Sequence, residues 1–318
     1  MVPCQFGRKK AANRSPQLPA ILLAVVGFFA RPSMAPLIAS CVLLLSAATP
    51  RAAGSVPSPG PVELEPRTLQ AFERYARLTE VREEDELRAG APFLWVDALS
   101  ESQREQAYAQ LRAGKVQIER LETREQGKLI ECPSGLIHHW LGVIFIPGVT
   151  LEQTLRILQD YDHHASYYKP EVERAKILEH HGNDFRVFLR FHRKKVITVV
   201  LDTEHEIHYS PIDATHAHSR SRTTRIAEVE NRGRADEREK PVGHDGGYLW
   251  RMDTWWRFVE RDGGTYVQCE SVSLTRSIPT GLGWLVGPFV NSIPRESLTF
   301  TLNATRASLL QKLPAPRE

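Results

Sequence analysis

Twelve histidines are the residues of this chain best suited to acid–base or metal chemistry, and all lie between His138 and His244. His138 and His139 are neighbours in an apolar stretch that reads as a strand, so one of them points to each face. An inward histidine can pack as a satisfied core residue, hydrogen-bond a ligand carbonyl or transfer a proton. His205 and His208 fall on opposite faces of a later strand and cannot chelate one ion together. We predict no metal site, and we keep His138 as a candidate ligand contact.

Arg222 and Arg225 are two further residues of which one could be buried on an inward strand face. Arg222 and Arg225 are three residues apart on one expected strand, so they should lie on opposite faces. The inward arginine, which we take to be Arg225, would need a carboxylate or a ligand anion as partner. Glu270 or Asp253 could be that partner if the register is shifted by one residue. A buried structural pair and a substrate clamp both remain open.

The motifs of several enzyme classes are absent from the sequence. It contains no Gly-x-Ser-x-Gly elbow, no His-Glu-x-x-His, no Gly-x-Gly-x-x-Gly, no phosphate loop and no Cys-x-x-Cys. We therefore assign no catalytic residues and no cofactor, and we favour a non-enzymatic role while leaving the question of catalysis open. The net charge is only +3, and no basic block occurs beyond Arg8–Lys10, which argues against nucleic acid as a partner.

The pattern of elements predicts an α+β domain. A capping box at Thr150-Leu151-Glu152-Gln153 opens a short helix, and Ser100-Glu101-Ser102-Gln103 matches a second capping box. A short apolar element over 281–290 precedes a final helix, capped by Ser292 with Pro294 in its first turn. Helices are expected at 67–89, 100–113, 151–160 and 164–168, and strands at 135–146, 172–180, 184–192, 196–209, 216–229, 248–260 and 265–276.

This order, together with the stretch GLGWLVGPFVNSIPRESL, resembles the START-like (Bet v 1-like, SRPBCC) helix-grip superfamily over about 180 residues. It is similar in particular to exported bacterial START-like proteins whose role is undescribed. The resemblance implies a curved antiparallel sheet wrapped around a long C-terminal helix, with an apolar cavity between them. The superfamily includes carriers of lipids, quinones and sterols as well as cyclases, so the fold alone does not select the role.

Strand periodicity sorts the residues that would line such a cavity. The inward sets are large and aromatic, except on 265–276, where small polar residues suit either close helix packing or a wet cavity floor. The candidate ligand-binding residues are His138, Phe185, Leu189, Val199, Leu201, Arg225, Trp250, Met252, Trp256, Ser271, Ser273, Trp284 and Phe289.

The N-terminal region indicates export. A basic flank, two short apolar runs and small residues before Gly54 are typical of a signal peptide, with Met1 or Met34 as the start. An uncleaved membrane anchor is the alternative. In an exported protein Cys132 and Cys269 could form a disulfide or remain two buried thiols. The expected parts are a signal or anchor (1–53), a proline-rich linker (54–66), a helical extension plus strand (67–128), the START-like domain (129–313) and a tail (314–318).

These observations favour an exported, periplasmic or secreted protein that binds or carries an apolar small molecule of the lipid or quinone class. An aromatase/cyclase-type enzyme on the same fold is one alternative, and an envelope structural protein with a filled core is another. Residues 281–290 are apolar enough either to plug the core at the start of the helix or to contact a membrane surface and gate the cavity. The sequence does not indicate an oligomeric state.

Overall fold

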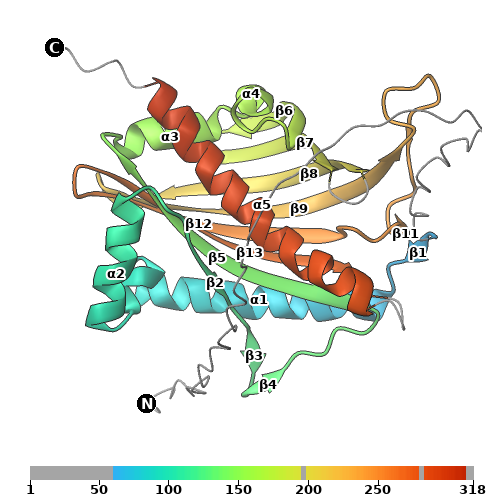
Figure 1. The fold of residues 1–318 in the computed structure, drawn as a ribbon, viewed down its shortest axis with the longest axis horizontal. Coiled ribbons are helices and arrows are strands. Elements are labelled where there is room, and N and C mark those ends of the chain that lie inside the picture. The colour runs from blue at the N-terminus through green and yellow to red at the C-terminus, as the bar shows by residue number, and fades with distance from the viewer. Residues whose placement is uncertain (1–59, 195–197, 279–282, 313–318) are drawn as a thin grey trace, which may run out of the picture. The chain divides into compact units, whose positions relative to one another are not determined.

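The computed structural model describes residues 60–194, 198–278 and 283–312, and within 283–291 it describes the backbone alone. One large antiparallel sheet and one long helix dominate this part of the chain (Figure 1). The strands of the sheet are β2 (Gln117–Arg120), β5 (Gly135–Pro147), β6 (Val172–His181), β7 (Asp184–Lys194), β8 (Thr198–Pro211), β9 (His216–Glu230), β10 (Arg238–Glu239), β12 (Arg251–Arg261) and β13 (Gly264–Arg276). The helices are α1 (Pro66–Arg88), η1 (Trp95–Ala98), α2 (Glu101–Arg112), α3 (Leu151–Gln159), η2 (Tyr161–His163), α4 (His164–Tyr167) and α5 (Gly283–Lys312). Two short ribbons complete it, made by β1 (Val62–Glu63) with β11 (His244–Asp245) and by β3 (Arg124–Glu125) with β4 (Lys128–Leu129).

The strand order in the sheet is β2-β5-β13-β12-β9-β8-β7-β6, with β10 attached to β9. Strands β6, β7, β8 and β9 follow one another as antiparallel neighbours, and α3 and α4 carry the chain from β5 to β6. Every expected strand is present with its ends within three residues of the predicted limits. The prediction of an α+β helix-grip architecture is confirmed.

Both faces of the sheet are covered, and we name them after the helices that cover them. On the α5 face, a Cβ added to Gly142 would lie only 2.6 Å from Leu302 Cδ1 of α5. On the α1 face, Phe72 of α1 packs with Val272 and Leu274 of β13. Burial on both sides explains why the sequence of β5 is almost continuously apolar rather than alternating.

The C-terminal helix is longer than expected. α5 runs without interruption from Gly283 to Lys312, whereas the sequence pattern predicted a separate element over 281–290 and a new helix after Ser292. Pro294 therefore lies inside the helix, where a proline removes one backbone hydrogen bond at a cost of about 3 kcal/mol. Packing on the sheet offsets this cost. The buried leucines of the described part of α5 are Leu298, Leu302 and Leu309.

The helices α1, α2, α3 and α4 are present where the sequence predicted them. Of the two predicted capping boxes, the one at the start of α3 is present and the one at the start of α2 is not. Thr150 Oγ1 accepts the Gln153 N–H at 3.2 Å while Gln153 Oε1 accepts the Thr150 N–H at 2.9 Å, as expected. Ser100 caps no backbone group of α2, because its hydroxyl donates to Gln103 Oε1 at 2.7 Å instead.

Cys132 and Cys269 are both free thiols, so the disulfide alternative is wrong. They lie on different sides of the sheet, since Cys132 packs beside the α1 cluster and Cys269 belongs to the α5 cluster. Among the described residues no helix is long and apolar enough to cross a membrane. Residues 1–53, on which the prediction of export depends, lie outside the described part of the chain.

Candidate ligand-binding face

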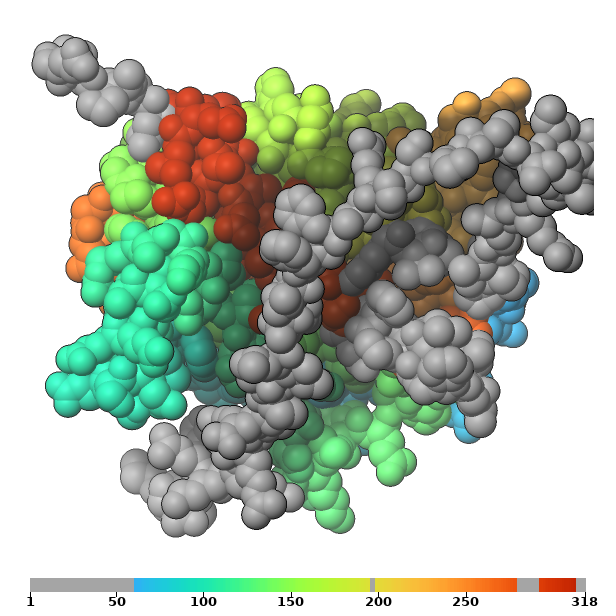
Figure 2. Space-filling model, in the orientation of Figure 1, coloured from blue at the N-terminus to red at the C-terminus, as the bar shows by residue number. Residues whose placement is uncertain are grey.

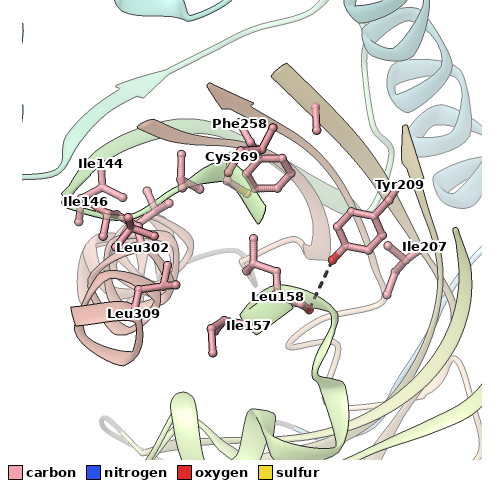
Figure 3. Close-up of a cluster of buried hydrophobic side chains, with 14 of the residues drawn as sticks. Ile144, Ile146, Ile157, Leu158, Ile207, Tyr209, Phe258, Cys269, Leu302 and Leu309 are labelled. Atoms are coloured by element: carbon pink, nitrogen blue, oxygen red, sulfur yellow. Dashed lines mark hydrogen bonds between the residues drawn. The ribbon is translucent and has the colours of Figure 1, made fainter. Parts of the chain in front are cut away.

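One end of the α5 face is a filled core. In Figure 3, Ile144 and Ile146 of β5 lie beside Leu302 and Leu309 of α5. Tyr161 and Tyr209 share a hydrogen bond of 2.8 Å between their hydroxyls, and Tyr209 also donates to a main-chain carbonyl of α3 at 3.4 Å. The C-terminal half of α5 lies against α3 and α4 here, as the space-filling view shows (Figure 2). This end of the face is occupied by the protein's own side chains.

Beside this core, the same face carries large apolar side chains that are only half-buried. They come from β5, β7 and β12, and we call them the half-covered strip: Trp140, Leu189, Phe191, Met252 and Trp256. Side chains of this size on an inward face are normally buried in a filled core. Trp140, Leu189 and Trp256 touch the edge of the filled core. The strip is therefore an apolar surface that the described residues cover only in part.

Hydroxyl groups run across the strip from strand to strand. Ser271 is the cross-strand partner of Trp140 and of Thr254, and Thr254 is in turn the partner of Ser221. Directly opposed side chains in a sheet lie about 4.5–5.5 Å apart at Cβ, so these residues are close neighbours. The hydroxyls of Ser221, Ser271 and Ser273 form no hydrogen bond with another described residue. They could orient a polar group on an apolar ligand.

Two buried histidines border the strip and are neutral. His138 Nε2 lies 3.0 Å from Thr275 Oγ1, and His205 Nε2 lies 2.9 Å from Thr203 Oγ1. Because the Thr203 hydroxyl donates to the carbonyl of Leu189, it must accept from His205, which leaves Nδ1 of that ring as an acceptor. Burial lowers the pKa of both His138 and His205 to about 4. Each ring can therefore hydrogen-bond a ligand but carries no charge at neutral pH.

The α1 face holds a buried ionic network that sequence reasoning missed. His139 Nε2 lies 2.6 Å from Glu270 Oε1, and Arg82 of α1 pairs with the same oxygen. Arg257 donates to Glu83 Oε2 of α1 at 2.8 and 3.0 Å. Strand alternation puts Arg257 on the opposite face from Trp256, where α1 covers it and leaves it 3% exposed. The charged face of α1 was the available signal, because its acids and arginines match the charges on these strands.

Opposing effects set the charges in this network. Burial alone would raise the pKa of Glu270, but the hydrogen bond with His139 and the charge of Arg82 outweigh it and lower the pKa to about 2. Burial and the neighbouring Glu270 raise the pKa of Glu83 to about 7. The network attaches α1 to the sheet and shows no opening toward the half-covered strip, so we read it as structural.

The structure brings together part of the candidate set. Leu189, Met252, Trp256, Ser271 and Ser273 meet on or beside the half-covered strip, with His138 at its border. Phe185 belongs to the filled core. Val199 and Leu201 lie on the same face of β8 as His205, by strand alternation. The side chains of Trp284 and Phe289 lie outside the described residues.

Two candidates were placed on the wrong face. Arg225 pairs with Glu239 on the α1 face, because a β-bulge between Glu204 and His205 shifts the phase and puts Arg222 and Arg225 on the same side. Trp250 packs with the α1 cluster and donates from Nε1 to Asp245 at 3.0 Å. It precedes β12, where the alternation of the strand does not apply.

These corrections weaken the enzyme alternative. That alternative expected an inward histidine, arginine and carboxylate in one cluster. Within the described ranges, His138 meets only a threonine hydroxyl, His139 faces α1, and Arg225 faces away from the strip. The arrangement can bury an apolar molecule and hydrogen-bond a polar group on it.

Comparisons with known proteins show likeness in fold only. No family model matches the sequence, and no curated protein matches it. A structure from Thermus thermophilus is 16% identical, with a TM-score of 0.40, covering 57% of this chain and 99% of its own. A STAR-related lipid transfer protein from Xanthomonas axonopodis is also 16% identical, with a TM-score of 0.40 and coverages of 61% and 99%. An aromatase/cyclase from a Streptomyces species is 15% identical, with a TM-score of 0.35 and coverages of 57% and 98%. The element order and sheet described above are those of a helix-grip fold.

Proposed function

We propose that this protein is an exported binding protein or carrier for an apolar small molecule of the lipid or quinone class, held on the α5 face. The half-covered strip is the observation that carries the proposal. Large apolar side chains remain half-buried there, although the neighbouring core is packed to near-zero exposure. An apolar ligand would remove this surface from water at a gain of about 25 cal/mol per Å².

The polar groups around the strip define how such a ligand would be oriented. Free serine hydroxyls and neutral histidine rings suit a carbonyl or hydroxyl group, as in a quinone or a neutral lipid. Contact of residues 281–290 with a membrane surface would give the ligand a route in and out. That contact stays a prediction.

A pair of matched substitutions tests the binding face. Ser271→Phe places an aromatic ring on the strip beside Trp140, whereas Thr224→Phe places one at an exposed position of β9 that has no cross-strand partner. The probe is N-phenyl-1-naphthylamine, whose fluorescence rises in apolar surroundings. We expect Ser271→Phe to weaken binding at least about tenfold and Thr224→Phe to leave it unchanged. If both variants bind the probe equally well, the half-covered strip is not the binding site.

Export is tested separately by cell fractionation and N-terminal sequencing. We expect a periplasmic or secreted protein that has lost the apolar runs before residue 54. A cytoplasmic protein that retains residues 35–50 would contradict export without affecting the ligand-binding part of the proposal.

A further inference from the structure

A polar site, separate from the apolar half-covered strip, lies elsewhere on the sheet. A hollow of about 400 Å³ opens over β6, β7, β8 and β9, lined mainly by charged side chains and two histidines. Three of the lining residues are arginines: Arg186, Arg220 and Arg222. Their strands carry them on the α1 face, because Arg222 pairs in register with Asp253, which alternates with Arg257 beneath α1.

Sheet register brings these arginines together. Arg186 is opposite Glu206, and Glu206 is opposite Arg222 on the next strand. In the adjacent row, Arg220 lies between His208 and Trp255. The two rows place three guanidinium groups around one hollow.

Several buried hydrogen-bond donors on the residues that line this hollow, or next to them in the sheet, lack a partner. Arg186 Nε, Arg220 Nε and Nη2, and Trp255 Nε1 are buried and form no hydrogen bond with any described residue. Buried donors are almost always satisfied in native proteins, so such a concentration requires an explanation. A fifth unsatisfied atom, the acceptor Glu270 Oε2, lies on the strand beside Trp255. Among these atoms donors exceed acceptors four to one.

The nearby carboxylates are already engaged, with one exception. Glu80 of α1 pairs with Arg220 and lies 3.9 Å from Arg222. Glu179 is 3.1 Å from Arg186, and Asp184 is 2.6 Å from His208. Glu206 is exposed and forms no ion pair within the described ranges. The protein therefore leaves guanidinium donors available, while Glu206 opposes any anion that approaches them.

We propose that this hollow binds a compact organic oxyanion whose carboxylate or phosphate group accepts hydrogen bonds from Arg186 and Arg220. The planar guanidinium fork matches either group in a bidentate arrangement. The hollow is much larger than a single oxyanion needs, so the ligand carries an organic part. The site is independent of the apolar ligand proposed for the α5 face.

The test uses citrate and inorganic phosphate as probes, with sodium chloride at matched ionic strength as the reference. Isothermal titration calorimetry and thermal unfolding are measured on the wild type and three variants. Arg186→Gln removes a lining guanidinium whose ion pair is with Glu179 alone. Glu206→Gln removes the opposing charge. Arg232→Gln is the control, an exposed arginine paired with Glu173 outside this hollow.

We expect at least one probe to bind and to raise the unfolding temperature beyond the chloride reference. Arg186→Gln should weaken that binding about tenfold, Glu206→Gln should strengthen it, and Arg232→Gln should leave it unchanged. Arg220→Gln should abolish it, but this variant can also loosen α1 through Glu80, so Arg186→Gln decides. The proposal is overturned if neither probe exceeds the chloride reference, or if Arg186→Gln and Arg232→Gln bind alike. Either result would mean that water alone satisfies these donors.

Discussion

The helix α5 packs closely on the sheet at Gly142, because this residue has no Cβ. A Cβ at this position would lie 2.6 Å from Leu302 Cδ1, 2.9 Å from Ile118 Cδ1 and 3.3 Å from Leu298 Cδ2. The first two distances are shorter than real Cβ contacts, so Gly142→Ala must displace the side chains of Leu302 and Ile118. Overpacking of this kind costs about 1–3 kcal/mol.

A double-mutant cycle identifies the contact responsible. Leu302 is fully buried, so Leu302→Ala alone should cost about 2–5 kcal/mol. In the double variant the shortened side chain makes room for the new methyl group. We expect the double variant to be more stable than the sum of the single effects by about 1 kcal/mol, because Ile118 still restricts the site.

Urea unfolding measured by circular dichroism gives the required free energies. Gly60→Ala is the control, since a Cβ there meets nothing within 4 Å. The reasoning is refuted if Gly142→Ala is as stable as the control variant, or if the two single effects simply add. Either result would mean that Leu302 does not pack against Gly142 as closely as described.

Three further predictions concern single side chains of the sheet. Burial holds the pKa of His205 at about 4, below the ordinary value of 6.5. As the pH falls from 6.5 to 4, the unfolded chain therefore binds a proton before the folded one does, and the free energy of unfolding decreases. His205→Gln should remove up to about 3 kcal/mol of this acid sensitivity, measured in pH-dependent thermal melts. Trp256→Ala should cost about 3 kcal/mol, the lower end for a core tryptophan because the ring is half-buried, and unchanged urea unfolding would contradict its inward placement. Glu270→Ala should cost about 1–3 kcal/mol, because it removes the buried carboxylate that His139 and Arg82 share, and a neutral effect would show that the network does not hold α1.

The sequence was sufficient for the strands because their periodicity is local. Ile207 and Tyr209 sit on the α5 face as the alternation predicts, and so do Trp256 and Phe258. The alternation of side chains between the two faces fails where the pairing of two strands is irregular. The bulge after Glu204 reversed the face of Arg225, and a bulge leaves no signature in the pattern of apolar residues.

Burial on the α1 face was harder to predict than strand position. His139, Arg257 and Glu270 look like outward polar residues of a half-exposed sheet, and only the docking of α1 buries them. That docking joins residues 82 and 270, which are 188 positions apart, so the charged face of α1 indicates it only when it is matched with charges on distant strands. The continuous α5 was missed for a related reason. Ser292 and Pro294 favour a helix start locally, whereas packing on the sheet sustains the helix through them.

The central claim is that the α5 face carries an apolar small molecule, and native mass spectrometry of the protein purified without detergent tests it most directly. The account predicts a folded protein with one bound mass of lipid or quinone size, recoverable by organic extraction and missing from Ser271→Phe but not from Thr224→Phe. A folded wild-type protein that shows only its own mass, and yields no extractable apolar molecule, would contradict the claim.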